Sequence, residues 1–234
     1  YLLKRYVFRE SGVLVSGIVG GLYSSTATIS VLARKSRNIH SGQATEYVAA
    51  MLLAVSMMFL RFMILISIFS REIFLDIYPY LLIMALTAAA VAWFIHSRRK
   101  KTDVTENVDE DEDGSNPLEF KVALIFAVLF VVFTVLTHYT LIYAGTGGLN
   151  LLSFVSGFSD ITPFILNLLQ STGTVAALVI TACSMQAIVS NIMVNMCYAL
   201  FFAGKGSKLR PWILGGFGCV IAVNAVVLLI FYFL

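Results

Sequence analysis

Long apolar runs follow one another along the chain, each about 20 residues long and separated by short polar or charged connections. A helix of that length matches the roughly 30 Å hydrocarbon thickness of a lipid bilayer. Only 12% of the residues are charged, and this is about half the share found in a soluble domain. A membrane β-barrel would instead show alternating segments of about ten residues. The sequence therefore predicts an all-α fold, a polytopic transmembrane helix bundle in contact with the lipid bilayer.

Seven membrane segments are predicted, together with one clearly soluble stretch. That stretch, residues 97–119, carries four basic residues and then eight acidic ones, so we expect a solvated acidic loop. The segments are 12–33, 46–70, 77–95, 118–144, a fifth that begins near residue 150, 172–203 and 211–234. The predicted domains are a first membrane repeat (1–96), the acidic loop (97–119), a linking transmembrane helix (120–148) and a second membrane repeat (149–234).

Two of these segments carry more glycine and hydroxyl groups than a plain membrane anchor would. Residues 17–36 hold three glycines and six Ser or Thr residues, and residues 156–163 read S-G-F-S-D-I-T-P. Glycine lets backbones approach closely or lets a helix break, and hydroxyl groups supply hydrogen bonds where water is absent. We therefore predict an interrupted helix at each of the two stretches.

The two halves of the chain resemble each other. Residues 21–26 align with 157–162, Ser56 aligns with Ser184, and Pro79 aligns with Pro211, at spacings of 136, 128 and 132. These matches predict two pseudo-symmetric repeats with interrupted first helices, a pattern that points to a central binding site in transporters. Chance similarity between apolar segments is the alternative. Parallel and inverted repeats both remain open, and so does the orientation, because seven simple crossings would place eight basic residues on one face and seven on the other.

Inside the predicted membrane segments, two residues carry a full charge: Arg61 and Asp160. Each costs about 2.5–3.5 kcal/mol at the bilayer centre on insertion scales, so such residues usually face the bundle interior and pair. One interpretation is a buried Arg61–Asp160 ion pair that fixes the two halves together. The other is a polar centre that binds an ion or a small solute through one of these charges.

Further polar side chains cluster in the same segments and complete the candidate ion- or solute-binding set. Hydroxyl groups and amides also join helices in lipid, so each residue taken singly has a purely structural interpretation. The full candidate set is Ser24, Ser25, Thr26, Thr28, Arg61, Asp160, Thr162, Asn191 and Asn195. No His, Cys or carboxylate cluster has metal-ligand spacing, which leaves metal binding undetermined, and no cofactor is expected. No enzyme motif is present, so we expect no enzymatic activity, and we expect no nucleic-acid binding.

Residues 20–28 (G-G-L-Y-S-S-T-A-T) and 33–36 (A-R-K-S) resemble the signature of a family of uncharacterised prokaryotic membrane proteins. In that family the domain of unknown function often follows an MgtC/SapB-like four-helix domain, and residues 156–160 (S-G-F-S-D) look like its second motif. The resemblance implies a multi-pass protein of a bacterial or archaeal inner membrane and an upstream membrane domain before Tyr1. It implies no activity, and Asn195 stands where relatives often carry a basic residue.

Two functional hypotheses follow. The first is a transporter- or channel-like integral membrane protein with a central polar site for an ion or small solute between the two repeats. The second is a non-transporting, MgtC-like membrane module that binds or regulates a partner, in which Arg61 and Asp160 are structural. Under either hypothesis a homo-oligomer is compatible with the sequence.

Overall fold

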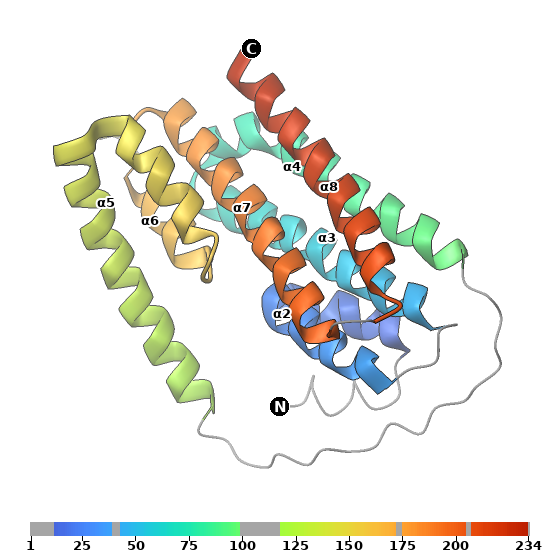
Figure 1. Ribbon diagram of the computed structural model, residues 1–234. Coiled ribbons are helices and arrows are strands. Elements are labelled where there is room, and N and C mark those ends of the chain that lie inside the picture. The colour runs from blue at the N-terminus through green and yellow to red at the C-terminus, as the bar shows by residue number, and fades with distance from the viewer. Residues whose placement is uncertain (1–11, 39–42, 99–117, 172–174, 205–206, 234) are drawn as a thin grey trace. The chain divides into compact units, whose positions relative to one another are not determined.

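The computed structural model describes residues 12–38, 43–98, 118–171, 175–204 and 207–233, and within these residues the chain is helical without strands (Figure 1). The elements are α2 (Val13–Lys35), the short 3-10 helix η1 (Ser36–Asn38), α3 (Ala44–Phe69), α4 (Arg71–Ser97), α5 (Leu118–Ser156), α6 (Thr162–Gln170), α7 (Ala177–Ala203) and α8 (Arg210–Phe233). The core of the predicted acidic loop, residues 99–117, lies outside the described residues.

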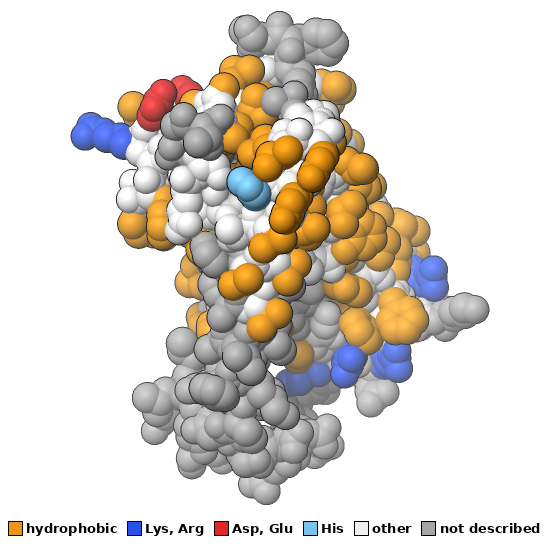
Figure 2. Space-filling view, turned by 90° about the vertical axis from the view of Figure 1, so that its left-hand side faces the viewer, with side chains coloured by type: hydrophobic (Ala, Val, Ile, Leu, Met, Phe, Trp, Pro, Cys, Tyr) orange, Lys and Arg blue, Asp and Glu red, His pale blue; other side chains and the backbone are white. Residues whose placement is uncertain are grey.

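Five of the helices are long and apolar enough to cross a membrane: α2, α3, α4, α7 and α8. Shorter apolar stretches cover Val131–Gly145 and Gly147–Ser156 within α5. Large apolar side chains such as Ile68 and Trp93 remain about three-quarters exposed, and Figure 2 shows a broad apolar surface. A surface of this kind suits contact with lipid. The predicted all-helical membrane protein is thus confirmed at this level, whereas the seven-segment repeat layout stays a prediction.

The chain divides into two compact units. Unit 1 contains residues 1–103 and 192–234, and unit 2 contains residues 104–191. The last part of α7 therefore belongs to unit 1 and its first part to unit 2.

Helix α3 forms the centre of unit 1, and its side chains from Val48 to Val55 are almost all fully buried. Helix α4 runs antiparallel to it after a break at Ser70, whose side chain accepts a hydrogen bond from Ile73 N and so caps α4. Across the pair, Ser56 Oγ donates to Ala85 O at 3.0 Å.

Helix α8 packs lengthwise against both α3 and α4. Gly216, in its first half, lies so close to Leu52 and Ile95 that an added methyl group would meet both side chains. Near its other end, Phe231 packs edge-on against Tyr80 at 5.4 Å. Helix α8 therefore runs antiparallel to α4 and parallel to α3.

In unit 2 the long helix α5 is interrupted at Gly145, where the chain adopts a φ of 58°. This left-handed conformation is one that glycine adopts without steric cost. The short helix α6 packs beside α5, with Phe133 and Phe164 5.5 Å apart and Asn167 Nδ2 donating to Thr134 Oγ1 at 2.8 Å.

Candidate functional site: two broken helices

The first interruption lies at Ser24, where α2 leaves the helical conformation with φ −156° and ψ 109°. The arm before it packs directly against α3. A methyl group on Gly21 would lie 2.5 Å from Ala54 Cα, and one on Gly17 would collide with the Ala50 carbonyl. Both contacts join residues that are 33 positions apart, so this arm runs parallel to α3.

The arm after Ser24 must return toward the start of α3. If α2 continued straight in the same register, Lys35 would lie beside residue 68, about 36 Å from Ala44 at 1.5 Å per helical residue. The nine steps from Lys35 to Ala44 span at most about 32 Å when fully extended, and η1 shortens this reach further. Helix α2 is therefore a helical hairpin, termed the first hairpin below, with its tip at Ser24.

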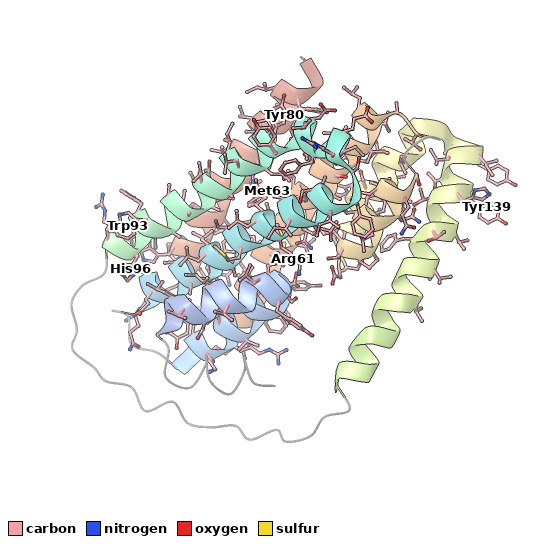
Figure 3. All side chains as sticks on the ribbon, turned by 180° about the vertical axis from the view of Figure 1, so that it is seen from behind. Arg61, Met63, Tyr80, Trp93, His96 and Tyr139 are labelled. Carbon is pink, nitrogen blue, oxygen red and sulfur yellow. The ribbon has the colours of Figure 1, made fainter. Side chains whose placement is uncertain are left out.

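Two hydrogen bonds satisfy the backbone at this tip. The Tyr23 carbonyl, at the end of the first arm, accepts a hydrogen bond from Arg61 Nη1 at 2.6 Å. Arg61 is labelled in Figure 3. Ser24 Oγ accepts one from Ala27 N at 3.3 Å and so caps the second arm. The Arg61 charge lies at a helix C-terminus, where the helix dipole favours a cation.

The second interruption lies between α5 and α6 in unit 2 and has the same construction. The arm Gly147–Ser156 packs on the first part of α7, where Cys183 Sγ donates to Asn150 Oδ1 at 3.3 Å and Ser190 Oγ donates to Phe154 O at 2.7 Å. A methyl group on Gly157 would meet the Ser190 side chain. The Cys183–Asn150 and Gly157–Ser190 contacts again join residues 33 positions apart.

The chain also turns back after this arm. In the same register Gln170 would lie beside residue 203, about 39 Å from the start of α7, but only seven residue steps connect them and these reach about 25 Å. The segment from Gly147 to Gln170 is therefore a second hairpin, with its tip at residues 157–161.

The second tip is capped by different side chains. Asn191 Nδ2 donates to Gly157 O at 3.1 Å and to Ser159 O at 3.3 Å, at the end of the first arm. Asp160 Oδ1 accepts a hydrogen bond from Thr162 N at 2.9 Å, at the start of α6. An acidic group is favoured at a helix N-terminus. One tip thus has a cationic side chain and the other an acidic one.

The candidate residues chosen from the sequence divide between the two units. Ser25 and Thr28 are buried in the first hairpin, at 3% and 6% exposure, and Thr26 O accepts a hydrogen bond from Ser30 Oγ. Asn195 is fully buried in the part of α7 that belongs to unit 1. Because Arg61 and Asp160 belong to different units, their pairing stays a prediction, as does the ligand-binding role of the set.

The structure adds Ser190 and the carbonyl groups of Tyr23, Gly157 and Ser159 to the tips. A sequence does not indicate which backbone carbonyls lie at a site. Ser190, in contrast, could have been selected from the sequence as a polar residue next to Asn191. Within the described residues no group of three or more His, Cys, Asp or Glu side chains is placed to hold a metal ion. The polar groups at the tips are chiefly hydroxyl, amide and carbonyl groups with one guanidinium and one carboxylate.

These features define a class of protein: an α-helical membrane protein with broken helices. The sequence-family model for the domain of unknown function DUF4010 matches residues 1–203. The chain belongs to that family. An uncharacterised protein of Aquifex aeolicus (strain VF5) is 26% identical over 212 residues, which cover 86% of this chain and 87% of the relative. No solved structure matches the chain.

Proposed function

We propose that this protein is a transporter- or channel-like integral membrane protein of a prokaryotic inner membrane. In this proposal, the polar groups at the hairpin tips bind an ion or a small solute. The observation that carries the proposal is the pair of interrupted helices, because such helices bring backbone dipoles and freed carbonyl groups to the middle of the membrane in transporters.

The depth of the first tip supports this role. In the register of Gly17 and Gly21 on α3, Ser24 lies beside residue 57. That position is midway between the ends of α3, at Ala44 and Phe69. An arm of about 11 residues is about 16 Å long, which is about half of the hydrocarbon thickness.

The shared register also supports two repeats. Gly21 on Ala54 and Gly157 on Ser190 are equivalent contacts at a single spacing of 136 residues. The same spacing relates Ser24 to Asp160, and each of these residues accepts a hydrogen bond from a backbone N–H at the start of the second arm of its hairpin. At this spacing, Ser56 of α3 aligns with a residue of α7 that lies eight positions after Ser184. The sequence comparison had instead aligned Ser56 with Ser184 itself.

Flux measurements on the protein in proteoliposomes test the proposal. Asp160→Asn is the sharpest variant, because an amide oxygen keeps the acceptor for Thr162 N while the negative charge is removed. Arg61→Gln similarly keeps an N–H donor for Tyr23 O. Asp76→Asn, an exposed acid at the end of unit 1 away from the hairpin tip, is the matched control.

We expect wild type and Asp76→Asn to move at least one member of a panel of cations, anions and small zwitterions. Asp160→Asn and Arg61→Gln should reduce that flux at least tenfold while remaining folded. Equal flux in all four proteins, or background flux in wild type across the whole panel, would refute the proposal.

A further inference from the structure

Several helix ends of unit 1 lie together at one end of the unit, which is the end where the first hairpin opens. Both of its arms open beside the start of α3, since Gly17 lies on Ala50 and the chain returns to Ala44. Helix α4 ends there because it is antiparallel to α3. Helix α8 begins there, with Gly216 against Ile95. The end of α7 joins them, since Arg34 lies 4.3 Å over the ring of Phe202.

Among the described residues of unit 1, six of the eight basic side chains lie at or next to one of these helix ends. We call this end of unit 1 the basic end. The set comprises three residues at the end of α2 and in η1, one at the end of α4 and two before or at the start of α8: Arg34, Lys35, Arg37, Arg98, Lys208 and Arg210.

The other end of unit 1 comprises the end of α3, the start of α4 and the end of α8. Among the described residues, Arg71 is the one basic residue there, and it is next to Glu72 in the sequence. Within the part of unit 1 that the structure describes, the count is therefore six basic residues against one, because a hairpin replaces the simple first crossing.

Aromatic side chains accompany the basic residues at this end. Trp93 and Phe201 are 76% and 73% exposed, and Arg98 lies 4.9 Å over the ring of Phe94. Exposed aromatic rings beside Lys and Arg are typical of the boundary between hydrocarbon and head groups. The basic end therefore has the chemistry of an interface with lipid head groups.

We infer that the basic end of unit 1 lies at the cytoplasmic leaflet and contacts anionic lipid head groups, so that the first hairpin opens toward the cytoplasm. Membrane proteins retain Lys and Arg on the cytoplasmic side, and acidic residues contribute little to this bias. Anionic lipids of that leaflet attract basic residues next to a membrane helix. The inference depends on unit 1 alone and is independent of any transport activity.

Cysteine accessibility tests the orientation. Cys197 and Cys219 are exposed and are replaced by Ser, while the buried Cys183 is kept. Single cysteines then replace the exposed Ser97 at the basic end or the exposed Glu72 at the other end. A membrane-impermeant maleimide applied to intact cells should label Glu72→Cys and should label Ser97→Cys only after permeabilisation.

Labelling of Ser97→Cys in intact cells, or protection of Glu72→Cys until permeabilisation, would overturn the orientation. Ser207→Cys and Asp76→Cys provide a second pair at the two ends should a variant of the first pair fail to fold.

The lipid contact has its own test in vesicles of phosphatidylcholine with or without 30% phosphatidylglycerol. The full chain should melt several degrees higher with phosphatidylglycerol, and the double variant Lys35→Gln/Lys208→Gln should lose at least half of this shift. Arg71→Gln at the other end is the control and should keep the shift. An equal shift in all three proteins, or no shift in wild type, would overturn the contact with anionic lipid.

Discussion

Replacing Gly21 by Ala should separate the first hairpin from α3. A methyl group built on Gly21 lies 2.5 Å from Ala54 Cα and 2.7 Å from Ala54 O, whereas ordinary carbon contacts need about 3.5 Å. Both partners are backbone atoms of a buried helix, so no side-chain rotation can relieve the clash. The hairpin arm must instead retreat by about 1 Å along its whole length.

Overpacking of a well-packed core costs about 1–3 kcal/mol, and the backbone partners put Gly21→Ala at the upper end of that range. Ala also favours a helix by up to about 1 kcal/mol over Gly, which offsets part of the cost. We therefore expect a net loss of about 2 kcal/mol. Gly218→Ala in α8 is the matched control, because nothing lies within 4 Å of its added methyl group, and it should gain up to about 1 kcal/mol.

Reversible unfolding in mixed micelles of a mild detergent and dodecyl sulfate measures both variants. The two should differ by about 3 kcal/mol, roughly a hundredfold in the unfolding equilibrium constant. Equal stabilities of Gly21→Ala and Gly218→Ala would show that the hairpin does not pack on α3 in this register. Arg61→Met tests the same geometry in a double-mutant cycle, since a retreating arm carries the Tyr23 carbonyl away and the two losses should not add.

The second tip gives further expectations, all measured by the same unfolding assay. Asp160→Ala removes the acceptor for Thr162 N and should cost about 1 kcal/mol, whereas Asp160→Asn keeps it and should cost less than half as much; equal losses would contradict the cap. Asn191→Leu removes two donors to the carbonyls of Gly157 and Ser159 and should cost about 1–3 kcal/mol, with faster amide exchange at residues 157–161. Gly157→Ala should destabilise the protein about as much as Gly21→Ala, because its added methyl group would meet Ser190 Cβ at 2.5 Å and the backbone N of Asn191 at 2.8 Å, and rotation of the Ser190 side chain moves neither atom.

The sequence predicted where the first helix breaks better than it predicted what the break does. Glycines and hydroxyl groups around Ser24 indicated an interruption, and the structure places one there. The reversal of direction could not be predicted, because α2 has 23 residues and a helix of that length can cross a bilayer. Only the register of Gly17 and Gly21 on α3 excludes a straight crossing.

The hydrogen-bond partner of Arg61 could not be predicted from the sequence either. Its hydrogen bond to Tyr23 O joins residues 38 positions apart, and the acceptor is a carbonyl group that every residue carries. The Gly157 motif was more informative, because Pro163 is a residue favoured in the first turn of a helix. The structure places α6 directly after it.

Capping and charge cannot be separated at either tip by deleting a side chain. Arg61 holds the end of one arm while it supplies a positive charge, and Asp160 holds the start of another arm while it supplies a negative one. Truncation to Ala therefore removes a helix cap and a charge together, and a loss of flux after such a change would not identify a solute site. The amide variants Asp160→Asn and Arg61→Gln keep the caps, so a loss of flux with preserved stability in these two proteins would assign the charges themselves to the solute.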